Sequence, residues 1–242
     1  MITISGLRAG YGKLEVLHDL TLTIPGRQFS AILGPNGSGK STLLKSLMGL
    51  TNIFGGSAQI DGLELLGRRT ESMSEHGIAY VPQRSNVFTS MTVYENLQLA
   101  VRRLRRVEAK SAIDEACTVF PILAKRPNQR ADQLSGGERQ MLAIALAWLS
   151  RPRALLLDEP SAGLSPLVTN EMYRLLQSLN ESGMMLVVVE QNARTILRWC
   201  AHVFVLREGR LAFEGTAEAC RADEEMVKTY LSVGGKRFTP EV

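Results

Sequence analysis

Residues 34–41 read GPNGSGKS and follow a short apolar run, FSAIL, at 29–33. The spacing matches G-x-x-x-x-G-K-[ST], and a strand before it and a helix after it, expected at 41–50, are the setting in which that motif binds phosphate. Gly34, Gly37 and Gly39 allow backbone N–H groups to turn inward around phosphate oxygens, and the helix directs its positive end at the same anion. Lys40 adds a mobile charge for the β and γ phosphates, and the Ser41 hydroxyl fits a Mg²⁺ ligand. We therefore expect a nucleotide phosphate site on a strand–loop–helix unit.

A second motif, LLLDE at 155–159, supplies acidic groups for such a site. Asp158 leaves a buried strand, where its carboxylate could hold Mg²⁺ through water. Glu159 follows immediately and could polarise an attacking water as a general base. An acidic pair at a strand end often only caps the next helix, so the phosphate loop is what gives this pair its catalytic interpretation.

The order of the apolar runs predicts an α/β fold. Residues 2–24 alternate apolar and polar positions, as in an antiparallel hairpin, and short strands punctuated by glycine follow at 51–83. Apolar runs at 154–158 and 185–190, with a helical pattern between them at about 168–181, are typical of a mostly parallel sheet. Further helices are predicted at 92–131, where Thr92 and Glu95 form a capping box, and at 138–149.

Composition excludes several classes of protein. The 242 residues, 45% hydrophobic and 21% charged, have an ordinary globular composition. The amino end lacks the pattern of a signal peptide, and the longest apolar stretch, 141–149, is shorter than the ~18 residues of a membrane span. Three widely spaced cysteines, Cys117, Cys200 and Cys220, indicate neither a disulfide framework nor a metal site, which favours a reducing cytosol. The net charge of +4 is too small to indicate nucleic-acid binding by itself.

The segment LSGGE at 134–138 has the pattern of a second anion site. Ser135 and Glu138 form a capping box at a helix start, which alone would be a structural role. Gly136 and Gly137 each cost up to ~1 kcal/mol in a first helical turn, so we expect them where backbone approaches a ligand closely. The presence of two phosphate-binding motifs for one nucleotide is explained if the motifs act in trans across a dimer.

These motifs together resemble the ATP-binding cassette (ABC) family over about residues 2–232. The resemblance is carried by GPNGSGKST, YVPQ with its Gln83, LSGGE and LLLDEP, in that order and at family-like spacing. It implies an ATPase of the P-loop NTPase type, in which a mostly parallel sheet is joined by an antiparallel N-terminal β-subdomain and an inserted α-helical subdomain at about 84–131. Residues 1–242 would then form a single ATP-binding domain with a loose tail at about 233–242.

The resemblance also implies roles for individual residues. Tyr11 matches the aromatic residue that stacks on adenine, Gln83 the residue that touches Mg²⁺ and the attacking water, and Glu159 the catalytic carboxylate. The predicted ATP contacts are Tyr11, Gly34, Pro35, Asn36, Gly37, Ser38, Gly39, Lys40, Ser41, Thr42, Ser135, Gly136 and Gly137. The predicted Mg²⁺ ligands are Ser41, Gln83 and Asp158, and the predicted catalytic residues are Glu159, Gln191 and Gln83.

Gln191 departs from the pattern of most of the family, in which a histidine at this strand end contacts the γ-phosphate. A glutamine keeps a donor for the phosphate, but it does not become cationic near neutral pH as histidine does. The stretch VVVEQNA resembles ATP-binding subunits of branched-chain amino acid importers and of related urea and amide importers. Ser165, in GLSP, likewise replaces the aspartate that is usual in the loop that crosses the dimer.

The resemblance implies a peripheral protein on the cytoplasmic face of the cell membrane. Its expected partners are transmembrane permease subunits, a second ATP-binding subunit in a homo- or heterodimer and, indirectly, a substrate-binding protein; nucleic acid is not expected. We expect an importer of branched-chain or related amino acids. A lipid exporter is an alternative, because a cassette alone does not encode the direction of transport. A soluble ABC protein of translation or DNA repair is a third possibility, although such relatives usually fuse two cassettes or carry long coiled-coil insertions.

Overall fold

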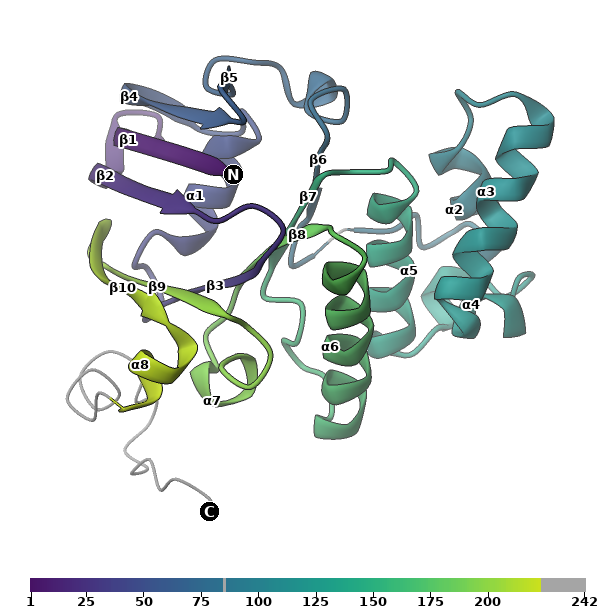
Figure 1. Ribbon diagram of the computed structural model, residues 1–242. Helices are drawn as coiled ribbons and strands as arrows, with labels where there is room; N and C mark the ends of the chain where they lie inside the picture. Colours follow the sequence, from purple (N-terminus) through teal and green to yellow (C-terminus); the bar gives the residue numbers. More distant parts are fainter. Residues whose placement is uncertain (85, 223–242) are drawn as a thin grey trace.

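The N-terminal part of the chain forms an antiparallel sheet. The computed structural model describes residues 1–84 and 86–222, so the tail expected at 233–242 lies outside the described residues. The strand order is β2-β1-β4-β5 (Figure 1), with bounds β1 Ile2–Tyr11, β2 Leu14–Ile24, β4 Asn52–Ile60 and β5 Leu63–Glu64. β1 and β2 pair antiparallel from Ile2↔Ile24 to Tyr11↔Leu14, which confirms the hairpin predicted at 2–24.

A second, mostly parallel sheet forms the centre of the molecule. Its order is β10-β9-β3-β8-β7-β6, and its pairs are parallel except for β9 with β10. The bounds are β3 Phe29–Leu33, β6 Ile78–Val81, β7 Ala154–Asp158, β8 Met185–Val189, β9 His202–Arg207 and β10 Arg210–Thr216. This arrangement confirms the predicted fold class, whereas the β9–β10 hairpin was not predicted. Glu208 and Gly209 make its two-residue turn with φ values of 50° and 74°, the backbone that such tight turns require.

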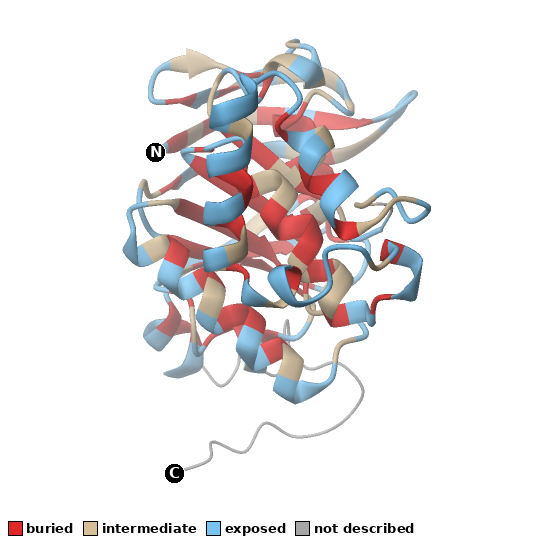
Figure 2. Cartoon of the chain, turned by 90° about the vertical axis from the view of Figure 1, so that its right-hand side faces the viewer, coloured by how far each residue is buried: buried red, intermediate tan, exposed pale blue. Residues whose placement is uncertain are grey.

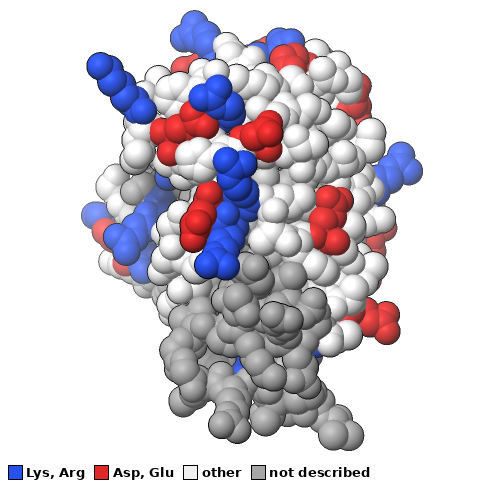
Figure 3. All heavy atoms as spheres, turned by 90° about the vertical axis from the view of Figure 1, so that its left-hand side faces the viewer, with Lys and Arg blue, Asp and Glu red and all other residues white. Residues whose placement is uncertain are grey.

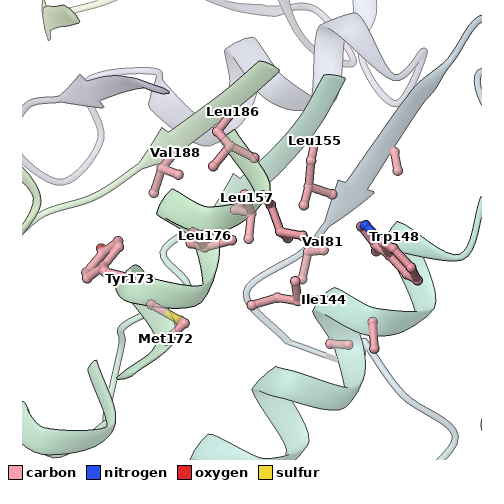
Figure 4. Packing of buried hydrophobic residues seen from close by; sticks show 14 of the residues in the cluster. Val81, Ile144, Trp148, Leu155, Leu157, Met172, Tyr173, Leu176, Leu186 and Val188 are labelled. Carbon is pink, nitrogen blue, oxygen red and sulfur yellow. The ribbon is translucent and has the colours of Figure 1, made fainter. Parts of the chain in front are cut away.

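Alternate residues of the central strands face two hydrophobic cores, because side chains along a strand point to opposite faces. Leu155 and Leu157 of β7 lie in the core on the helical side, and Figure 4 shows them with Ile144 and Leu176. Leu156 lies in the other core, which the antiparallel sheet covers. Every residue of β3, β7 and β8 is buried, which explains their continuous apolar runs.

The helices are divided between these two cores. α1 packs Leu43, Leu44 and Leu47 into the core beneath the antiparallel sheet, whereas α2 to α6 contribute to the other core. Their buried residues face inward and their outer faces are exposed (Figure 2). The bounds are α1 Lys40–Leu47, α2 Val93–Ala100, α3 Arg106–Val119, α4 Pro121–Lys125, α5 Gly136–Trp148, α6 Pro166–Glu181, α7 Ala193–Ile196 and α8 Ala217–Ala222.

Both predicted capping boxes are present. At α2 the Thr92 hydroxyl accepts from the Glu95 N–H at 3.2 Å, and the Glu95 carboxylate accepts from the Thr92 N–H at 2.7 Å. At α5 Ser135 and Glu138 exchange the equivalent bonds at 3.3 and 2.8 Å. Each box satisfies backbone donors that a helix start leaves unpaired.

Within the described residues, no helix has the length and apolar character needed to cross a membrane. On the face of the molecule that Figure 3 shows, acidic and basic side chains lie interspersed among uncharged ones.

Candidate nucleotide-binding and hydrolytic site

The predicted phosphate loop joins β3 to α1 in a backbone conformation that depends on glycine. Gly34, Gly37 and Gly39 have φ values of 145°, 79° and 99°, where other L-residues are strained. A Cβ on Gly34 would also lie 2.2 Å from the Leu206 carbonyl oxygen of β9, so this turn has no room for a side chain. Pro35, Asn36 and Gly37 are exposed and form the crest of the loop.

Lys40 is the first residue of α1, and its side chain folds back over the loop. It is 4% exposed, and Nζ donates to the carbonyl oxygens of Gly34 at 2.9 Å and Pro35 at 3.0 Å. Burial lowers the pKa of the ammonium, and the carboxylates of Glu159, Asp158 and Glu190 oppose that shift. The ammonium is therefore held at the loop, in the field of the three carboxylates at the carboxyl ends of β7 and β8.

Ser38 and Thr42 are buried beside this lysine. The Ser38 side chain is 2% exposed, and its hydroxyl has no hydrogen-bond partner among the described residues. A buried hydroxyl without a partner is unfavourable, and in this loop it suits an oxygen-rich ligand. The first turn of α1 adds N–H groups that a helix cannot satisfy internally. The loop thus fits a phosphate by its backbone, its lysine and its unpaired hydroxyl.

Ser41, Tyr80 and Asp158 form a cluster of oxygen atoms next to the loop. The Ser41 hydroxyl donates to Asp158 Oδ1 at 2.8 Å, and the Tyr80 hydroxyl donates to Oδ2 at 3.1 Å. Burial and the Asp158 carboxylate raise the pKa of Tyr80, which keeps its hydroxyl protonated as a donor. Carboxylate and hydroxyl oxygens are the donor set that Mg²⁺ prefers, so these residues fit that ion. Sequence reasoning missed Tyr80, although it stands three positions before Gln83 in YVPQ.

Gln83 and Glu159 meet from chain segments far apart in sequence. Gln83 follows β6, and its Nε2 donates to Glu159 Oε2 at 2.7 Å. Glu159 follows β7 with a φ of 46°, a left-handed conformation that is uncommon outside glycine, and its N–H donates to the Val189 carbonyl at 2.9 Å. The predicted base therefore lies at the carboxyl ends of the parallel strands, next to the residue predicted to contact Mg²⁺ and water.

Gln191 and Glu190 continue from β8 at the same sheet edge. Gln191 is half-buried, whereas Glu190 is 3% exposed. Glu190 Oε1 accepts from the Ser161 N–H at 3.1 Å and from the Tyr173 hydroxyl at 2.7 Å. Burial raises the pKa of this carboxyl, and the two donors oppose the rise. Sequence reasoning assigned no role to Glu190, because nothing local to it identifies a partner.

Tyr11 is the last residue of β1 and lies next to α1, the helix that follows the phosphate loop. Its side chain is 42% exposed, and the Lys45 Nζ of α1 lies 6.0 Å from the ring centroid. An exposed ring beside the phosphate-loop helix has a free face for the stacking role that the resemblance implies.

The LSGGE segment lies apart from the phosphate loop of its own chain. Ser135 and Gly136 are exposed at the start of α5. The parallel sheet separates α5 from α1, because the two helices pack into the cores on its opposite faces. A Cβ on Gly137 would come within 2.3 Å of Val168 Cγ1 at the start of α6, so close helix packing already requires this glycine. The same test on Gly136 finds ordinary contact, 3.7 Å from Leu164 Cδ2. Packing therefore explains Gly137, whereas Gly136 has room for a side chain and remains the glycine that close approach of a ligand would explain.

Comparison with known proteins agrees with this geometry. Residues 17–162 match the model of the ABC transporter family. The chain is 38% identical over 234 residues to the probable branched-chain amino acid transport ATP-binding protein LivF of Archaeoglobus fulgidus, covering 96% of this chain and 99% of that one. It is 32% identical over 242 residues to the lipopolysaccharide export system ATP-binding protein LptB of Haemophilus influenzae, covering 98% of each. Among solved structures, a dimeric post-hydrolysis state of an ATP-binding cassette bound to ADP and Pi has a TM-score of 0.79, at 26% identity over 90% of this chain and 99% of that one.

The family match covers more than half of the chain, and both relatives align over nearly their whole length. The chain belongs to the ABC transporter family, as an ATP-binding subunit that hydrolyses ATP.

Proposed function

We propose that this chain is the motor subunit of a membrane importer for branched-chain or related amino acids and works as a nucleotide-sandwich dimer. The observation that carries the ATPase part is the meeting of four residues beside the Lys40 loop: Ser41 from the start of α1, Gln83 from the end of β6, and Asp158 and Glu159 from the end of β7. The importer part rests on the likeness to LivF and on Gln191 in VVVEQNA.

The phosphate loop binds the triphosphate of ATP. Gly34, Gly37 and Gly39 open the backbone, and Lys40 exchanges its bonds to loop carbonyls for the β and γ phosphates. Tyr11 carries the adenine. Pro35, Asn36, Ser38, Ser41 and Thr42 complete the contacts from the same loop and helix start.

Ser41, Gln83 and Asp158 would hold Mg²⁺, and Tyr80 orients the Asp158 carboxylate through Oδ2. When bound, the ion neutralises charge that develops on the phosphate oxygens. Glu159, steadied by Gln83, accepts a proton from the attacking water. Gln191 donates to the γ-phosphate from the end of β8 and remains neutral across the physiological pH range.

The second phosphate contact comes from a partner copy. Ser135 caps the start of helix α5, and Gly136 and Gly137 are its first residues. This helix packs on one face of the parallel sheet, and α1 packs on the opposite face. A head-to-tail dimer brings this helix start to the phosphate loop of the other subunit, in line with the dimeric cassette bound to ADP and Pi. ATP closes this dimer and hydrolysis reopens it, and the helices at 84–131 pass the motion to permease subunits at the cytoplasmic face of the membrane.

The test is coupled transport. The chain would be co-purified with the permeases encoded beside its gene, reconstituted in liposomes, and assayed for uptake of labelled leucine and for ATP hydrolysis with a substrate-binding protein. We expect leucine to accumulate only with ATP and Mg²⁺, and Glu159→Gln to abolish the uptake. Leucine uptake that is independent of ATP would contradict the proposal.

The likeness to LptB supports a second candidate, a lipid exporter, because this chain covers 98% of that relative and 99% of LivF. The same liposomes distinguish the two. Hydrolysis that responds to lipid and not to leucine with its binding protein would favour export, and stimulation by urea or an amide would favour the related importers.

A further inference from the structure

Glu190 is a buried carboxylate between two loops of the candidate site. It precedes Gln191, and its Oε1 accepts from the N–H of Ser161, which lies two residues after Glu159. Its own N–H donates to the Ile32 carbonyl at 3.1 Å, in the strand that leads into the phosphate loop. One residue thus connects the loops that carry Lys40, Glu159 and Gln191.

The loop that Glu190 holds contains the strained backbone of the site. Glu159 has a φ of 46°, and such a conformation costs of order 1–3 kcal/mol unless the surroundings enforce it. Two backbone bonds restrain it: the Glu159 N–H donates to Val189 at 2.9 Å, and its carbonyl accepts from Ala162 at 3.1 Å. The bond from the Ser161 N–H to Glu190 adds a side-chain restraint between them.

Tyr173 in turn fixes the Glu190 carboxylate. Its hydroxyl donates to Oε1 at 2.7 Å from α6, and the side chain is fully buried. The Tyr173 ring stacks on Trp199 with centroids 6.0 Å apart and an interplanar angle of 22°. The ring has little freedom to turn, so the carboxylate oxygen has a fixed position. Removing the partner of a buried polar group carries its full desolvation cost.

We infer that Glu190 is a positioning residue for hydrolysis: it holds the Ser161 N–H, and through it the Glu159 carboxylate, in the orientation that catalysis needs, with Tyr173 as its anchor. The inference rests on the proposed role of Glu159 as the base. The competing explanation is that Glu190 and Tyr173 only stabilise the fold, in which case their loss would act regardless of what residue 159 is.

Three variants separate these explanations. Glu190→Met keeps the length of the side chain and removes the acceptor, Glu190→Gln keeps an acceptor oxygen for Ser161, and Tyr173→Phe removes only the anchoring hydroxyl. We expect Glu190→Met to lower kcat about 10- to 100-fold with a much smaller change in the KM for ATP, as for a misplaced catalytic group. Glu190→Gln should retain most of the activity, and Tyr173→Phe should show a smaller loss than Glu190→Met.

Each change is then repeated in the Glu159→Gln background, with hydrolysis followed by single-turnover release of labelled phosphate. If Glu190 acts through Glu159, Glu190→Met and Tyr173→Phe should lower that residual rate no further, since the group they position is already disabled. Ser30→Ala is the matched control, because it removes a buried hydroxyl of β3 that has no partner among the described residues, and it should leave kcat unchanged.

Equal fold-losses in both backgrounds would overturn the inference, as would an activity of Glu190→Gln as low as that of Glu190→Met. If Glu190→Met does not fold, the same cycle with Tyr173→Phe decides the question. Should Glu159→Gln itself leave hydrolysis unchanged, the proposed base is wrong and the positioning role falls with it. A slow Glu159→Gln variant beside unaffected Glu190 and Tyr173 variants would remove only this inference.

Discussion

The phosphate loop at 34–41 and the LSGGE segment at 134–138 both predict an anion site, yet the structure builds them differently. In the loop, the glycines adopt positive φ, Lys40 bonds to the carbonyls around it, and the Ser38 hydroxyl is buried without a partner among the described residues. In LSGGE, the capping box satisfies the helix start from within, and Ser135 and Gly136 face solvent. The first motif is assembled by its own chain, whereas the second is a finished helix end that would complete a site in the other subunit of the proposed dimer.

The largest effect should come from the phosphate-loop motif. Lys40→Ala removes the positive charge that contacts the transferring phosphate. Such a contact is commonly worth ~3–4 kcal/mol, or ~10²–10³ in rate. Steady-state phosphate release measures the loss, and equilibrium ATP binding should weaken even in the monomer. Lys110→Ala, on the exposed face of α3, is the control and should hydrolyse ATP normally. A Lys40→Ala rate above half that of the unmodified chain would mean that another site hydrolyses the ATP.

A smaller loss, with intact ATP binding by the monomer, should follow a change in LSGGE. Ser135→Arg places a bulky side chain at the exposed helix start, and we expect a loss of about 10- to 100-fold in hydrolysis because the second phosphate contact is misplaced.

Mixing this variant with Lys40→Ala tests the dimer. Half of the dimers in an equal mixture pair one chain of each kind, and each such dimer contains one intact site if the motifs act in trans. The mixture should therefore recover about a quarter of the unmodified rate if the two sites act independently. No recovery in a mixture shown to exchange subunits would mean that both motifs serve the nucleotide of one chain.

Gln191 belongs to the half of the site that one chain assembles, since β8 lies beside β3 with Val189 opposite Ile32. Gln191→Ala should weaken ATP-driven dimerisation by ~1.5–3 kcal/mol, the value of a hydrogen bond to a charged group, and leave ADP affinity nearly unchanged. Gln191→His should restore much of the activity and introduce a pH dependence near ~6.5. Hydrolysis rates of the three proteins across that pH range test the pH dependence, and ADP binding is the control. An equal loss of ATP and ADP affinity in Gln191→Ala would mean that the residue is structural.

Sequence reasoning succeeded where the determining contacts are local. The capping boxes at Thr92 and Ser135 join residues only three positions apart. The strands at 29–33 and 154–158 have the predicted bounds because their burial on both faces leaves a continuous apolar run. It could not foresee partners set by the tertiary fold. Gln83 reaches Glu159 across 76 positions, Tyr80 reaches Asp158 across 78, and Tyr173 reaches Glu190 from a helix whose inward face looks like ordinary core.

The two glycines of LSGGE separate packing from function within one motif, and Gly136→Ala should have the smallest effect on stability. Gly137→Ala would place a Cβ 2.3 Å from Val168 Cγ1, and such overpacking costs ~1–3 kcal/mol of the free energy of unfolding. Gly136→Ala meets nothing closer than 3.7 Å, so its effect on stability should stay within ~0.5 kcal/mol or become slightly favourable, because alanine is the better helix former. Urea unfolding measures both changes, and gel filtration of Glu159→Gln chains with ATP measures the dimer. We expect Gly136→Ala to keep the fold and weaken the dimer, because in the proposed dimer the nucleotide phosphate of the partner subunit approaches its exposed backbone. A Gly136→Ala chain that dimerises as well as its parent would leave the LSGGE glycines with a packing role alone.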